Sequence, residues 1–128
     1  MRQIADVLRQ ETAGVPVIAF PRGVGAHFER DALHGSFAGI NIDTTVSSQW
    51  AVDHIQRRAA VQGHLSNQTL VEGGEKMQQE VEAMLKALGR GPYIFNLAHG
   101  VLPQTPPEHV TELLRLVRGP RWKRVPAP

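Results

Sequence analysis

Residues that could do chemistry follow short apolar segments of this chain. His99 lies between the small residues Ala98 and Gly100, just behind the apolar segment 93–97, and Asn96 precedes it. An imidazole in such a place can donate a hydrogen bond to a bound ligand or exchange a proton with it near neutral pH. His99 is therefore the first candidate catalytic residue.

Arg22 is the candidate cation. It follows the apolar segment 15–20 and precedes Gly23. A guanidinium at the carboxyl end of a buried strand can hold a carboxylate or a phosphate, often through two hydrogen bonds. A solvent-facing loop arginine is the competing interpretation, and the pattern alone does not separate the two.

The segment 23–28 resembles a GxGxxG dinucleotide-binding turn, and Asp43 ends the next apolar segment, where a ribose-binding acid would lie. Phe28 stands in place of the third glycine, whose absent side chain permits close helix–strand packing. An ordinary tight turn is therefore the better interpretation.

The other histidines give weaker signals. His27 and His34 could share one face of a helix, but without a third ligand they predict no metal site. His64 follows the apolar segment 59–63, and a ring that closes the mouth of the sheet is its simpler interpretation.

Composition excludes several classes of protein. The 128 residues include no cysteine, which excludes disulfide scaffolds, thiolate metal sites and cysteine nucleophiles. The net charge is only +2, so the pI of 9.5 does not require a polyanionic partner. No apolar run approaches the ~18 residues of a membrane span, and residues 1–10 lack a signal-peptide core. We expect a cytoplasmic protein that binds neither nucleic acid nor a membrane.

The elements that would position these residues alternate along the chain. Segment 15–20 is a continuous apolar run between turn residues, a pattern typical of a strand buried on both faces. One helix followed by four strand–helix units predicts an α/β fold with a parallel sheet, whose carboxyl edge binds ligands. The expected helices are 2–11, 25–34, one capped by Ser47 or Ser48, 74–88 and one capped by Thr105; the expected strands are 15–20, 38–43, 59–63 and 93–97. Residues 1–118 form the predicted domain, and 119–128 form a loose, basic, proline-rich tail.

Residues 93–110, YIFNLAHGVLPQTPPEHV, resemble the C-terminal motif of the uroporphyrinogen decarboxylase family. Three earlier segments, VPVIAFPRGVGA, GINIDTT and AAVQGHL, resemble other blocks of that family in the same order. The family fold is a TIM (β/α)8 barrel. The resemblance therefore implies the C-terminal half of a barrel, with four of its eight strands.

The resemblance also implies a function. The family decarboxylates uroporphyrinogen III to coproporphyrinogen III in porphyrin and haem biosynthesis, without a metal or another cofactor. His99 falls on the family's active-site histidine, and Arg22 on its basic position. The substrate-binding residues expected here are Arg22, Gly23, Asp43, Gln62, Asn96 and His99. The family's pyrrole-facing aspartate lies in the missing half, so the chain is expected to be inactive alone.

Three departures leave a second function open. Gly63-His64-Leu65-Ser66-Asn67 stands where the family has GNLDP, Ala98 stands where it has glycine, and Asn41 stands where it has an apolar or glycine-like residue. A non-catalytic half barrel that binds an anionic ligand or a partner protein is the alternative. In both cases the outer strands 15–20 and 93–97 would have unpaired edges, which predicts a homodimer or pairing with the missing N-terminal half.

Overall fold

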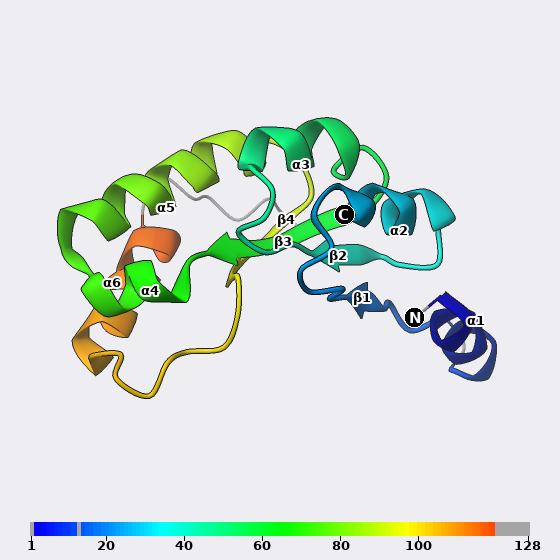
Figure 1. Ribbon diagram of the computed structural model, residues 1–128, viewed down its shortest axis with the longest axis horizontal. Coiled ribbons are helices and arrows are strands. Elements are labelled where there is room, and N and C mark those ends of the chain that lie inside the picture. Colours follow the sequence, from blue (N-terminus) through cyan, green and yellow to red (C-terminus); the bar gives the residue numbers. More distant parts are fainter. Residues whose placement is uncertain (1, 13, 120–128) are drawn as a thin grey trace.

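Four parallel strands form one sheet in the order β1-β2-β3-β4. The structure is a computed structural model that describes residues 2–12 and 14–119 (Figure 1). The strands are β1 (Ile18–Ala19), β2 (Gly39–Asn41), β3 (Ala60–Leu65) and β4 (Tyr93–Leu97). The helices are α1 (Arg2–Glu11), η1 (Gly25–His27), α2 (Phe28–His34), α3 (Ser48–His54), α4 (Asn67–Glu72), α5 (Gly74–Leu88) and α6 (Pro107–Arg118). The predicted α/β fold, half of a TIM barrel with four strands, is confirmed.

The helices cover one side of this sheet. Figure 1 shows α2, α3 and α5 along one side of the strands, with α1 beside β1 at one end and α4 after the carboxyl end of β3. Two clusters of buried side chains fill the space between the layers. One includes Phe28, Ile40, Ile42, Ile55 and Val61, and the other includes Leu65, Leu70, Met77, Val81, Leu97 and Leu113.

Three elements have the predicted bounds, namely α1, α5 and β4. In α5, Met77, Val81, Met84 and Leu88 are buried at helical spacing, and Gly89 follows its last residue. Strand β4 spans the predicted residues 93–97. Of the two candidate caps for α3, Ser47 is the one used: its hydroxyl accepts a hydrogen bond from the Trp50 N–H at 3.1 Å.

Strand β1 is much shorter than predicted. Val15, Ile18 and Phe20 are 58%, 42% and 39% exposed, and only Ala19 in this strand is buried. The prediction of a strand buried on both faces was therefore wrong. Within the described residues β1 pairs only with β2, so its second edge has no strand partner there.

The predicted cap of α6 was also wrong. Pro106, not Thr105, is the N-cap residue, with an extended ψ of 130°. The cause is Pro107, because a proline disfavours helical backbone in the residue before it. The short helix α4, which Ser66 caps through the Gln68 N–H at 3.2 Å, was missed altogether.

The other face of the sheet is partly exposed in residues 2–12 and 14–119. In β3, Val61, Gly63 and Leu65 are buried, whereas the alternate residues from Ala60 to His64 are half-buried. Since alternate residues of a strand share a face, Ala60 and Gln62 face away from the helices. Ile94, the register partner of Gln62, is 43% exposed on that face. This open face corresponds to the interior of a closed barrel.

Candidate active site

Amide and imidazole side chains line the open face toward the carboxyl ends of the strands. Gln62 Nε2 donates to Asn41 Oδ1 at 2.7 Å, and these two residues are register partners on β3 and β2. His64 and Asn96 are register partners on β3 and β4. Register therefore places these four residues beside one another across β2, β3 and β4. We call Asn41, Gln62, His64 and Asn96 the polar row.

Asp43 joins the loops that follow β1 and β2. Its carboxylate accepts hydrogen bonds from Gly23 N at 2.6 Å and Thr45 N at 2.9 Å, and from the Thr45 hydroxyl. Burial raises the pKa of Asp43, but the Thr45 and Gly23 hydrogen bonds and the charge of Arg22 outweigh burial and hold it below its usual value. Asp43 is therefore ionised at neutral pH and organises both loops.

Replacing Asp43 with asparagine should destabilise the chain by about 1–3 kcal/mol at pH 7, because charge-assisted hydrogen bonds are lost from a buried group. Because the folded pKa is depressed, the stabilisation is present above the unfolded pKa and lost as pH falls through the lower folded value. Thermal unfolding measured from pH 7 down to pH 3 checks this. Asp43→Asn should reduce the loss on the acid side, and an unchanged pH dependence would contradict the assignment.

Hydrogen bonds fix both the ring of His64 and the backbone that precedes it. Its Nε2 lies 2.9 Å from the hydroxyl oxygen of Ser48, the first residue of α3. The preceding carbonyl, of Gly63, accepts a hydrogen bond from the Tyr93 hydroxyl at 2.6 Å. Burial lowers the pKa of His64 and the nearby charge of Asp43 opposes that effect, so the ring is neutral at pH 7. Burial also raises the pKa of Tyr93, whose phenol stays protonated.

The family model described as uroporphyrinogen decarboxylase matches residues 1–120. The chain belongs to the uroporphyrinogen decarboxylase family. Curated proteins named uroporphyrinogen decarboxylase from Rhodospirillum rubrum and Mesorhizobium japonicum are 44% and 45% identical over 119 residues, which are 93% and 91% of this chain. One from Paracoccus denitrificans is 39% identical over 118 residues, or 92% of this chain.

The chain spans about a third of the length of these relatives, 34% in each of the three. The match is to the C-terminal part of the family's barrel, as the motif in residues 93–110 indicated. The four parallel strands account for the sheet of half such a barrel. No helix in the described ranges 2–12 and 14–119 has the length and apolar character needed to cross a membrane.

The residues predicted from the uroporphyrinogen decarboxylase motifs fall into three groups in space. Gly23 contacts Asp43 directly, and the charge of Arg22 acts on that carboxylate. Gln62 and Asn96 lie in the polar row. His99 is exposed in the loop after β4, on the opposite outer strand from the Arg22 loop. Arg22, Gly23, Asp43 and His99 follow strands at the carboxyl edge of the sheet, whereas Gln62 and Asn96 lie within β3 and β4.

Sequence reasoning missed two polar residues of this surface. Asn41 was noted only as a departure from the family, yet its side chain is buried and paired with Gln62. Ser48 was considered only as a helix cap, yet its hydroxyl contacts His64. Asn41 and Asp43 are two positions apart, and residues at that spacing point to the same face of a strand. This spacing could have placed both side chains on the ligand-facing side. No signal in the sequence pairs Ser48 with His64.

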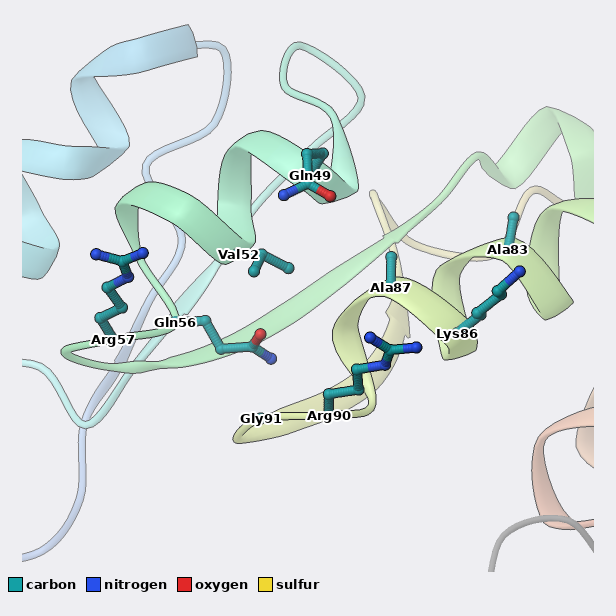
Figure 2. Close-up of a pocket in the computed structure, with 9 residues that line it drawn as sticks. All are labelled: Gln49, Val52, Gln56, Arg57, Ala83, Lys86, Ala87, Arg90 and Gly91. Carbon is teal, nitrogen blue, oxygen red and sulfur yellow. The ribbon is translucent and has the colours of Figure 1, made fainter.

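A cavity of about 660 Å3 lies elsewhere, between α3 and α5 (Figure 2). Arg57, Lys86 and Arg90 line it, and Gln56 closes one end by donating to the carbonyl oxygens of Leu88 and Pro92 at 2.6 and 3.3 Å. Gln56 and Arg57 lie between α3 and β3. Lys86 lies in the last turn of α5, and Arg90 lies between α5 and β4. Cations there complement the partial negative charge of the two helix C-termini. The cavity is therefore separate from the candidate active site.

Proposed function

We propose that this chain supplies the C-terminal half of a barrel that decarboxylates uroporphyrinogen III to coproporphyrinogen III in porphyrin biosynthesis. The observation that supports this proposal is the polar row near the carboxyl ends of the parallel strands, beside a sheet face that is partly exposed in the described residues. Ligands of parallel α/β sheets bind at that edge. Membership of the family agrees with the reaction.

In this reaction a protonated pyrrole ring accepts the electron pair of the broken C–C bond, so the tetrapyrrole takes the role of a cofactor. The protein has to bind several carboxylates and control protons. We assign the anchoring of carboxylates to Arg22 and contact with the reacting side chains to His99, both of which are exposed. Gly23, Asp43, Gln62 and Asn96 complete the proposed binding surface.

The missing half of the barrel is the proposed partner, and a second copy of this chain is the alternative. Strands β1 and β4 each have one neighbour among the described residues. Ile18, Phe20 and Ile94 are exposed beside these edges. A second set of strands would pair the free N–H and C=O groups and cover the apolar side chains. We place this assembly in the cytoplasm, without nucleic acid or a membrane as partner.

Binding without catalysis is the second candidate function. The observation that favours it is His64, which stands within the segment 63–67 that departs from the family's GNLDP block and is bonded to Ser48. A histidine in place of the family's asparagine could bind a different anionic ligand. Turnover by the assembled barrel separates the two functions.

Calorimetric titration with uroporphyrin III tests the binding surface. Arg22→Ala and His99→Ala should each weaken binding about tenfold in the assembled barrel, because a charge-assisted hydrogen bond is worth about 1.5–3 kcal/mol when solvent is excluded. Arg22→Ala should also reduce the salt dependence of the affinity. Arg30→Ala and His34→Ala, exposed residues of α2, are the matched controls. Equal affinity of all four variants would remove Arg22 and His99 from the site.

A further inference from the structure

Ser48, at the start of α3, and His64, near the end of β3, form a hydrogen-bonded pair. Ser48 Oγ and His64 Nε2 are 2.9 Å apart, and both residues are half-buried. In the neutral ring that carries its hydrogen on Nδ1, Nε2 is an acceptor, and the Ser48 hydroxyl donates to it.

The charges around His64 come from three directions. Asp43, after β2, and Glu80, on α5, both favour the protonated ring, whereas burial favours the neutral one and dominates. The positive charge of Arg22 in turn lowers the pKa of Asp43. Uncharged polar groups complete the surroundings: the Ser48 hydroxyl from α3, Asn96 from β4 and the Tyr93 phenol bonded to Gly63 O.

We propose that protonation of His64 reverses the Ser48–His64 hydrogen bond, so that Ser48 donates to a carboxylate side chain of the substrate. In the protonated ring Nε2 carries a hydrogen and donates to Ser48 Oγ. The Ser48 O–H is then free to donate outward, because a hydroxyl has one donor and can accept at the same time. A bound carboxylate stabilises the imidazolium in turn. This inference rests on the proposed function, since it names one anchor for that substrate.

The expected signature is proton-linked binding. The pKa of His64 is below its usual value in the free protein and is raised by a bound carboxylate. Between those two pKa values binding takes up about one proton, and the affinity falls about tenfold per pH unit as pH rises. Above the bound-state pKa the linkage disappears. The proton exchanges with solvent, and no bond of the substrate is broken in this step.

The test uses the chain assembled with the part of the Rhodospirillum rubrum relative that it does not match. Uroporphyrin III is titrated between pH 5.5 and 8, in buffers of different ionisation enthalpy, so that calorimetry reports proton uptake. His64→Asn and Ser48→Ala should both reduce proton uptake and flatten the pH dependence. The double variant should be no weaker than either single variant, because the two residues act as one unit. His34→Asn, an exposed histidine at the far end of α2, should behave as the parent.

The outcomes separate this inference from the proposed function. Binding by the parent with the same proton uptake in His64→Asn overturns the inference and leaves the proposed function standing. Absence of uroporphyrin binding by the parent overturns both. A loss of affinity in Ser48→Ala with unchanged proton uptake also overturns the inference, because it would show a hydroxyl contact independent of His64.

Discussion

The 128-residue chain by itself is expected to form no coproporphyrinogen from uroporphyrinogen III above the blank. The chain offers half of a barrel sheet, and the resemblance places the carboxylate that faces the pyrrole N–H groups in the other half. Groups that stabilise charge in the transition state act only when they are already oriented around the reacting atoms. Carboxylate contacts from one half alone cannot replace them. Anaerobic incubation followed by separation of the porphyrins measures the product.

Adding the unmatched part of the Rhodospirillum rubrum relative should restore turnover. Size exclusion with light scattering should show the complex, and a concentration-dependent association when the chain is alone. The His99→Ala variant, added in the same way, controls for activity that the relative contributes by itself. Turnover by the isolated chain would show that half of the barrel suffices and would contradict the division of roles proposed above.

Gly63→Ala is expected to destabilise the chain by about 3 kcal/mol, a large part of the 5–15 kcal/mol that holds a domain folded. A Cβ built on Gly63 would lie 2.6 Å from the Ile42 carbonyl oxygen, and the residue has a φ of +118°. Ile42 directly follows β2 and its N–H donates to the Gln62 carbonyl oxygen at 2.8 Å, so its backbone cannot move aside without disturbing the pairing with β3. The melting temperature should fall by about 10 °C.

Gly35→Ala is the matched control for the backbone angle. Gly35 has a φ of +72°, but a Cβ there would meet nothing within 4 Å. Its cost should be about 1 kcal/mol, the usual penalty for a side chain in this region. Both variants have to be compared at one protein concentration, because association makes the melting temperature depend on concentration. Equal destabilisation by the two substitutions would show that the approach to Ile42 is relaxed in solution.

Local signals in the sequence determined much of the architecture. The spacing of Met77, Val81, Met84 and Leu88 and the glycine after them predict α5 with its observed bounds. The alternation of strands and helices predicts the parallel sheet and the edge at which the candidate site lies. These features depend on backbone preferences and periodicity, which act over a few residues. The motif in residues 93–110 likewise indicated the family that the comparisons show.

Tertiary structure decided the extent of burial and the partners of the polar groups. Val15–Phe20 is apolar enough for a buried central strand, yet its exposure depends on what lies beside β1, which no local pattern contains. Ser48 meets His64 across 16 positions, and Asp43 meets Gly23 across 20. Such contacts depend on strand register and on the path of the loops. The sequence shows which side-chain types are present, but only the folded chain brings them together.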